Sequence, residues 1–199
     1  MRLLLFADVH ASLDGARDLV ARSGAVDAVV GAGDFARVRR GLGPTIDALA
    51  AIARPTVLVP GNNETLAELR AACRAWPAAR VLHGTSAEID GVVFFGLGGG
   101  VPVTPFGAWS FDLDEDEAAA LLEPCPEGAV LVSHSPPRGV LDRDASGRHL
   151  GSAAVRAAIA RLRPRLVVCG HIHAFAGQEA ELDGCRIVNP GPGGFLAEV

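Results

Sequence analysis

The sequence predicts an α/β fold. Short apolar runs of strand length alternate along the 199 residues with amphipathic stretches of helical period. Several of the runs are continuously apolar, which is typical of strands that are covered on both faces. Hydrophobic residues make up 49% of the chain and charged residues 21%, so the chain can bury a sizeable core. We therefore expect one α/β domain over residues 1–199.

Seven apolar runs are predicted to be strands. They are RLLLFAD (2–8), DAVVGAGD (27–34), TVLVP (56–60), VVFFGL (92–97), AVLVSH (129–134), RLVVCGH (165–171) and CRIVN (185–189). The last of them belongs to a predicted hairpin over 177–189, because an Asp-Gly pair at Asp183 and Gly184 separates two strand-like segments.

Four amphipathic stretches between these runs are predicted to be helices. They cover residues 12–23, 44–53, 64–76 and 152–162. Ser152 stands at a favoured N-cap position, and Pro44 opens its stretch. The acidic residues in 111–122 are expected to form the first turn of a further helix, where the helix dipole favours negative charge.

The charge and composition exclude several classes of function. The net charge is −5 and the pI is about 5.6, so no basic surface for duplex nucleic acid is expected. All 18 basic residues are arginines and the chain has no tyrosine, which rules out lysine and tyrosine chemistry. No run of about 20 apolar residues is present, so no membrane span is expected. The oligomeric state is left open.

The cysteines and the first residues favour a cytoplasmic protein. The start, MRLLLFADVH, has an apolar run too short for a secretory signal and reads as a first strand. Four widely spaced cysteines form no CxxC pair: Cys73, Cys125, Cys169 and Cys185. We therefore expect reduced thiols in the cytoplasm.

Polar side chains follow five of the predicted strands at the point where each strand ends. They comprise two carboxylates, one amide and four imidazoles: Asp8, His10, Asp34, Asn62, His134, His171 and His173. A lone buried histidine is more often a core residue than a ligand, but five unpartnered polar strand ends would be costly to bury. Because sites in α/β sheets lie at the carboxyl ends of strands, these residues predict a metal site.

The spacing of these residues suits two metal ions. In Asp8-x-His10 and His171-x-His173, both members of each pair can point to the same side of an extended segment. Seven ligands exceed the need of one four-coordinate ion, and the two oxygens of Asp34 make it the natural bridge. The donors suit divalent transition metals, with Mn first and Fe, Zn, Ni or Co as alternatives, more than Ca or Mg.

The order DxH, GD, GNxE, H and GHxH, over residues 8–173, resembles that of the calcineurin-like metallophosphoesterase superfamily. The tail RIVNPGPGG also resembles the closing hairpin of its small single-domain microbial members. The resemblance implies a four-layer α/β/β/α sandwich with two mixed β-sheets. It implies one ion on Asp8, His10, Asp34 and His173. It implies the other ion on Asp34, Asn62, His134 and His171.

Residue 63 departs from the family pattern. Asn63 stands where the superfamily usually has a histidine, which is generally held to assist the leaving group or to steady the transition state. An amide has no usable proton-transfer pKa near neutrality, although it can donate a hydrogen bond to phosphate. Asn63 therefore marks either a lost acid or a group that positions phosphate.

The resemblance implies a dinuclear phosphoesterase that hydrolyses a small phosphate ester with metal-activated water and without a covalent intermediate. Asp34, Asn63 and His134 are the expected catalytic residues. Phosphodiesters or activated esters are favoured, because leaving groups that need little protonation suit a site without the histidine. The alternative is a catalytically weak scaffold with this fold, like the phosphoesterase-like subunit of the retromer coat. The intact ligand set argues against the scaffold, and Asn63 argues mildly for it.

Three further stretches have competing interpretations. In the glycine-rich stretch 96–109, Phe106 or Trp109 either forms a wall beside the substrate or belongs to a plain surface loop. Arg37 is either solvated or in contact with the substrate phosphate. His149 is a surface-loop residue by default, and otherwise contacts substrate or supplies the missing acid. The match of GAGDFA (31–36) to a dinucleotide fingerprint is rejected, because Asp34 would face the pyrophosphate.

Overall fold

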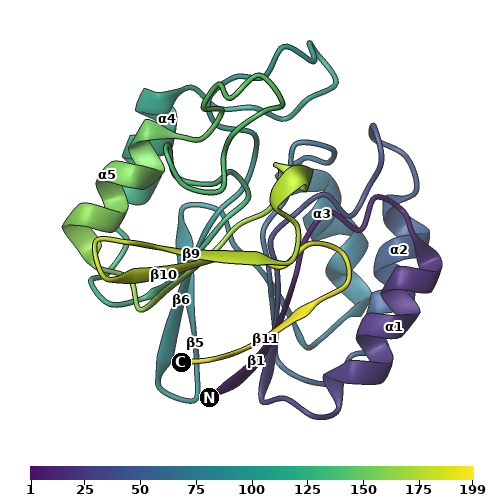
Figure 1. Ribbon diagram of the computed structural model, residues 1–199. Helices are drawn as coiled ribbons and strands as arrows, with labels where there is room; N and C mark the ends of the chain where they lie inside the picture. The colour runs from purple at the N-terminus through teal and green to yellow at the C-terminus, as the bar shows by residue number, and fades with distance from the viewer.

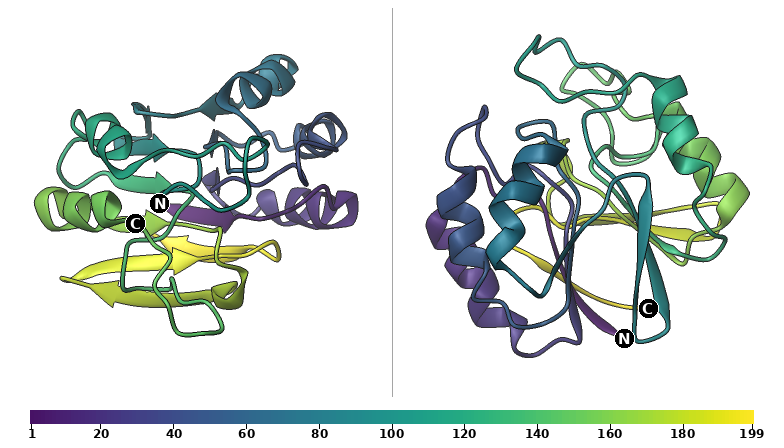
Figure 2. Two further views of the ribbon diagram at one scale, coloured as in Figure 1. Left: turned by 90° about the horizontal axis from the view of Figure 1, so that it is seen from above. Right: turned by 180° about the vertical axis from the view of Figure 1, so that it is seen from behind.

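Two β-sheets pack face to face and helices cover the outer face of each, so the chain forms four layers (Figures 1 and 2). The computed structural model describes residues 1–199. The first sheet has the order β11 (Phe195–Glu198), β1 (Arg2–Phe6), β2 (Ala28–Gly31), β3 (Thr56–Leu58) and β4 (Ala79–Val81). The second has the order β5 (Thr85–Ile89), β6 (Val92–Leu97), β7 (Val130–Ser133), β8 (Leu166–Val168), β10 (Cys185–Asn189) and β9 (Gln178–Leu182). The sandwich of two mixed sheets that the family resemblance implied is confirmed.

Both sheets are mixed: each has a parallel central part and at least one antiparallel edge strand. Strands β1 to β4 run parallel, and β11 pairs with β1 in the opposite direction. In the second sheet β6, β7, β8 and β10 run parallel, while β5 and β9 are antiparallel edge strands. The carboxyl ends of the parallel strands therefore lie along one edge of each sheet, which is where ligands of α/β sheets bind.

The continuously apolar strands have both faces buried. In β1, Leu3 and Leu5 point into the core between the sheets, whereas Leu4 and Phe6 pack against the helices. All four side chains are fully buried, which contributes about 1.5–3 kcal/mol for each. The alternation follows from the two-residue period of a strand, and it explains why the run contains no polar residue.

The helices lie in two groups on the outer faces, as Figure 1 shows. The first sheet is covered by α1 (Leu13–Ser23), α2 (Leu42–Leu49) and α3 (Leu66–Ala72), and the second by α4 (Glu115–Leu122) and α5 (Ala153–Leu162). Ser152 caps α5 as expected, and Asp114 caps α4 through a capping box with Glu117. None of these helices has the length and apolar character that a membrane crossing requires.

Three short strands were not predicted from the sequence. Strands β4 and β11 have three and four residues and lie at sheet edges, where no long apolar run is needed. Strand β5 pairs with β6 across Asp90 and Gly91, both with positive φ, so a second Asp-Gly hairpin signal was present. The predicted hairpin at Asp183 and Gly184 is confirmed by the pairing of β9 with β10. Several predicted ends lie one to four residues inside loops, and the helix predicted over 64–76 ends at Ala72 and continues as a 3₁₀ turn (Cys73–Ala75).

Candidate metal centre

Neighbouring strands continue as neighbouring loops at the open edge of the sandwich. Beyond β1 and β2, the amide of Asp8 donates to the carbonyl of Gly33, and the amide of His10 donates to the carbonyl of Asp34, both at 2.9 Å. Beyond β7 and β8, the amide of Gly170 donates to the carbonyl of His134 at 2.9 Å. These hydrogen bonds continue the strand pairing into the loops and so fix the backbone from which the polar side chains project.

Four of the seven predicted ligands have left-handed backbone conformations. The φ values are +58° at Asp8, +46° at His10, +58° at Asp34 and +67° at His171. Such values are uncommon for residues other than glycine and cost on the order of 1–3 kcal/mol each. Strain of this kind persists where the surrounding structure enforces it, and it clusters at functional sites. Here the four residues all belong to the two groups of donors described below.

The first group of donors comprises Asp8, His10, Asp34 and His173, whose ligand atoms all lie within 4.8 Å of one another. The Nε2 atoms of His10 and His173 are 2.9 Å apart. The Nε2 of His10 lies 3.7 Å from Oδ2 of Asp34, and that of His173 lies 3.9 Å from Oδ1 of Asp8. This group corresponds to one of the two predicted ion sites.

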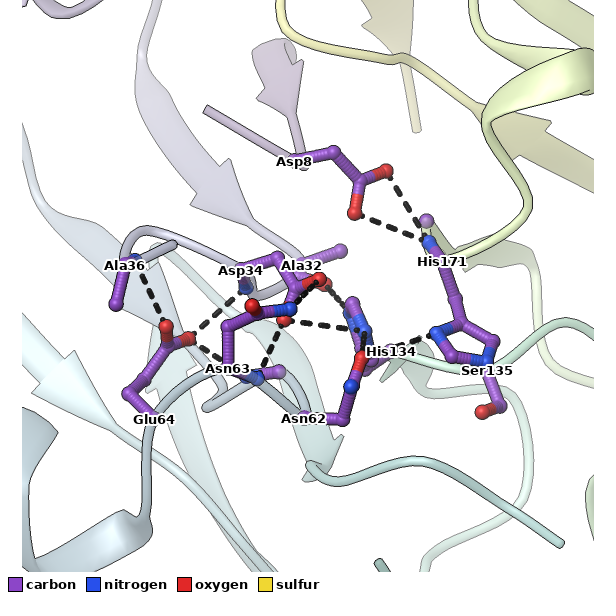
Figure 3. A network of polar contacts seen from close by, with 12 residues as sticks. Asp8, Ala32, Asp34, Ala36, Asn62, Asn63, Glu64, His134, Ser135 and His171 are labelled. Atoms are coloured by element: carbon purple, nitrogen blue, oxygen red, sulfur yellow. Dashed lines mark hydrogen bonds and ion pairs between the residues drawn. The ribbon is translucent and has the colours of Figure 1, made fainter. Parts of the chain in front are cut away.

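The second group of donors surrounds the amide oxygen of Asn62. That oxygen lies 3.3 Å from Nε2 of His134 and 3.1 Å from Nδ1 of His171. The hydroxyl of Ser110, 3.0 Å from the Asn62 Nδ2, accepts from it and so directs the amide oxygen toward the two imidazoles. Oδ1 of Asp34 lies 3.5 Å from Nε2 of His134 (Figure 3). Because Oδ2 is the oxygen near His10, Asp34 faces the two groups with different oxygens.

The chemistry of these donors fits bound cations. The Nδ1 of His134 is 2.7 Å from the carbonyl of Ala32, and the Nδ1 of His10 is 3.2 Å from the carbonyl of Ala36. Each Nδ1 therefore carries a hydrogen, and each ring directs its Nε2 toward Asp34. Imidazole nitrogens thus converge with carboxylate and amide oxygens, and this is a donor set that suits a divalent transition-metal cation.

The buried charges of the centre shift one another's pKa values. Burial and the charge of Asp34 raise the pKa of Asp8. Burial lowers the pKa of His134, but the carboxylates of Asp34 and Asp8 outweigh it and leave the pKa above its usual value. Burial and the neighbouring His134 lower the pKa of His171 to about 3. The ring of His171 is therefore neutral at ordinary pH and its lone pair is available to a metal.

Glu64 is a structural member of the centre to which the sequence analysis assigned no role. Its carboxylate is completely buried and accepts hydrogen bonds from the backbone amides of Asp34, Phe35, Ala36 and Gly61, at 2.8 to 3.3 Å (Figure 3). Burial and the charge of Asp34 raise its pKa to about 7, while the amides act in the opposite direction. Glu64 thus joins the loop after β2 to the loop after β3. The available signal was a carboxylate inside a glycine- and asparagine-rich turn.

Asn63 points inward and holds Asp34. Its Nδ2 donates to Oδ2 of Asp34 at 2.6 Å, and its backbone amide donates to Oδ1 at 2.9 Å. Its amide oxygen accepts from the backbone amide of Val38 at 2.6 Å. The side chain therefore has protein partners for both polar atoms, and the residue is only 6% exposed. In this arrangement Asn63 orients the carboxylate that faces both groups of donors (Figure 3).

The loops pack closely because two glycines allow it. Gly33 has a φ of +94°, and a Cβ there would lie 2.6 Å from the backbone of Gly61. A Cβ at Gly61 would collide with the carboxylate of Asp34. Only glycine at both positions lets the loops after β2 and β3 approach.

A cavity of about 380 Å³ opens beside the metal-binding residues. Phe106 and Trp109 line it, and their rings stack at a centroid distance of 5.4 Å. Arg143 and the two histidines of the first group also line it. Arg37 does not line this cavity; it is exposed in a turn closed by its amide and the carbonyl of Arg40. The arginine that lines the cavity therefore comes from a loop of the second sheet. Closeness to Asp34 in the sequence could not have identified it.

His149 lines an adjoining cavity of about 580 Å³. His171, Phe106, Asp144 and Leu150 line both cavities, so the two adjoin. The Nδ1 of His149 lies 2.7 Å from a carboxylate oxygen of Asp142. The remaining histidine, His83, lines neither cavity and accepts a hydrogen bond from the amide of Gly98.

Solved structures with the same fold are known. The structure of TT1561 of Thermus thermophilus is similar, with 18% identity, coverage of 96% of this chain and 88% of the other, and a TM-score of 0.76. So is the phosphopantetheinyl hydrolase PptH from Mycobacterium tuberculosis, with 18% identity, coverage of 95% and 88%, and a TM-score of 0.64. A dimetal phosphatase from Danio rerio has 15% identity, coverage of 94% and 86%, and a TM-score of 0.63. At these identities the similarity shows the fold alone.

The sequence itself identifies the family. No curated protein matches the chain. The family described as the calcineurin-like phosphoesterase superfamily domain matches residues 1–197, almost the whole length. The two mixed sheets and the clustered Asp and His side chains agree with that match. The chain therefore belongs to the calcineurin-like phosphoesterase superfamily.

Proposed function

We propose that this protein hydrolyses phosphate esters with two bound divalent transition-metal ions. The observation that carries the proposal is the pair of electron-rich donor groups that share Asp34. Asp8, His10, Asp34 and His173 would hold one ion, and Asp34, Asn62, His134 and His171 would hold the other. When bound, the ions supply Lewis acidity that lowers the pKa of a water nucleophile and offsets charge on the phosphoryl group. Manganese is the proposed metal.

The chain's own residues prepare the site for this reaction. Asn63 and Glu64 hold the loop and the carboxylate of Asp34, so little reorganisation is needed during the reaction. The carbonyl of Ala32 fixes the ring of His134 with its Nε2 directed inward. Phe106 and Trp109 form one side of the cavity, with their rings stacked.

The substrate is proposed to be a phosphodiester. Besides the metal-binding residue His171, the second cavity offers an apolar wall formed by Pro102, Val103, Pro105 and Phe106. This wall can accept a second alcohol group that a phosphate monoester lacks. Arg143, which lines the first cavity, is the arginine proposed to contact a phosphoryl oxygen, and His149 lines the second cavity. Direct contact of Arg37 with substrate has no support in this geometry.

Hydrolysis of bis-p-nitrophenyl phosphate with added Mn²⁺ tests the proposal against the scaffold alternative. We expect turnover by the loaded protein and none after chelation. His171→Ala should lose at least about 100-fold in kcat/KM, because removing even an indirect support of a metal ligand commonly costs 10- to 100-fold. His83→Ala is the matched control, since this imidazole lies outside both cavities. A loaded, folded protein without turnover of any phosphate ester would favour the scaffold.

A further inference from the structure

A short hairpin carries His149 to the cavity beside the metal centre. The amide of Leu150 donates to the carbonyl of Asp142 at 2.8 Å, and Arg143 and His149 pair as an antiparallel β-bridge across the hairpin. At the tip, the carboxylate of Asp144 accepts hydrogen bonds from the amides of Ser146 and Arg148 and from the Ser146 hydroxyl. Asp144 also pairs with the guanidinium of Arg148. These contacts fix the backbone on both sides of the imidazole.

Asp142 holds the imidazole in one orientation. This carboxylate is 1% exposed, and its Oδ2 accepts from the amides of Gly139 at 2.9 Å and Gly151 at 3.1 Å. Its Oδ1 is left for Nδ1 of His149, at 2.7 Å. Since a carboxylate only accepts, Nδ1 of His149 must carry a hydrogen. Nε2 is therefore the nitrogen that can exchange a proton with a ligand.

His149 is the one histidine outside the donor groups that lines the cavity system. Its side chain is 30% exposed, and His171 lies on the wall of the same cavity. The charged and titratable groups around the two cavities and the imidazole are Asp142, Arg143, Asp144, Arg148, and the donor residues His10, Asp34, His171 and His173. Asn63 cannot play the same part, because its amide transfers no proton near neutrality and is hydrogen-bonded to Asp34 and Val38.

We infer that His149 is the general acid for the leaving group and that Asp142 is its positioning residue; this rests on the proposed phosphodiester hydrolysis. Water forms the new P–O bond, and the bond from phosphorus to the ester oxygen breaks. The proton on Nε2 of the His149 imidazolium passes to the departing alkoxide, which leaves as an alcohol. The proton lost by the attacking water goes to solvent, from which His149 is protonated again. The carboxylate of Asp142 stabilises the imidazolium and keeps Nε2 directed to the cavity.

The test compares leaving groups at saturating Mn²⁺. Methyl aryl phosphodiesters, from p-nitrophenyl to phenyl, differ only in how much the departing oxygen needs a proton. For His149→Gln we expect kcat/KM within about threefold of wild type for the p-nitrophenyl ester and a loss of about 100-fold for the phenyl ester. Asp142→Asn should fall between the two proteins on the phenyl ester. His83→Gln, the control, should follow wild type throughout.

Ring ¹⁵N NMR of the protein loaded with diamagnetic Zn²⁺ gives a readout independent of turnover. We expect the neutral His149 ring to carry its hydrogen on Nδ1 in wild type and to lose this preference in Asp142→Asn. Equal losses of His149→Gln on all esters, or a neutral wild-type ring with its hydrogen on Nε2, would overturn the inference. Wild-type protein that hydrolyses no ester would instead overturn the proposed function. Circular dichroism and metal content identify a variant that has failed to fold.

Discussion

Replacing Asn63 by alanine tests whether this residue positions the shared carboxylate. The change removes the 2.6 Å hydrogen bond from Nδ2 to Asp34 and the acceptor for the amide of Val38. A hydrogen bond to a charged group contributes about 1.5–3 kcal/mol, whereas the exposed Val38 can turn to water at small cost. We therefore expect the metal-free protein to lose about 2–3 kcal/mol of unfolding free energy.

The same variant should bind metal less tightly. Without the side-chain amide of Asn63, the Asp34 carboxylate keeps only the hydrogen bond from the backbone amide of residue 63 and can rotate more freely. Loss of such a support typically weakens metal binding about 10- to 100-fold. Urea unfolding in chelator measures the stability, and calorimetric titration with Mn²⁺ measures the affinity.

Thr45→Ala provides the control for this experiment. It removes a buried hydroxyl that donates to the carbonyl of Gly41 at 2.8 Å, in helix α2 and away from the centre. We expect Thr45→Ala to lower the unfolding free energy and to leave the metal affinity unchanged. If Asn63→Ala keeps its affinity within twofold of wild type, the residue does not orient Asp34 and the reasoning from its contacts is refuted.

Four further outcomes are expected. Elemental analysis after gentle purification and Mn²⁺ loading should find close to two ions per chain; near-zero binding by protein with native circular dichroism would contradict the site. Asp34→Asn should lower activity far more than Arg37→Ala, and a change within about twofold, roughly 0.5 kcal/mol in the barrier, would exclude a bridging role. With His149 as the acid, Asn63→His should leave the dependence of kcat/KM on leaving-group pKa unchanged, and a gain confined to alkyl esters would show that wild type lacks an acid. Burial lowers the pKa of His134, but the carboxylates of Asp34 and Asp8 raise it more strongly. The contribution of His134 to the stability of the metal-free protein is therefore complete below pH 6.5 and is lost as pH rises through the higher folded-state pKa. Mn²⁺ must displace that proton, and calorimetry in buffers of different ionisation enthalpy should detect proton release and tighter binding at higher pH.

Among the strands, those with apolar side chains on both faces could be predicted from the sequence. The buried strands such as β1 could be recognised because both of their faces meet apolar layers. The edge strands β4 and β11 escaped because they are short and pair on one side only, so their residues need not be apolar.

The candidate site divides in a similar way. The predicted donors could be found because parallel strands bring their carboxyl ends together, so position in the chain stands for position in space. The role of Glu64 depends on four backbone amides from two loops, which no side-chain pattern records. The pairing of Asp142 with His149 depends on a hairpin closed by backbone hydrogen bonds, and Arg143 reaches the cavity from that same hairpin. Loop geometry, rather than residue type, decides these contacts.

The origin of the donors in both sheets has a consequence for how the molecule opens. Asp8, Asp34 and Asn62 follow strands of the first sheet, whereas His134 and His171 follow strands of the second. An ion held by both sets must be released before the sheets can separate, so occupancy adds to the free energy of that opening. At a free concentration of 100 times Kd the addition is about 2.7 kcal/mol for each independent site. Amide hydrogen exchange should therefore slow in β1 and β7 together, and by the same factor, as metal concentration rises.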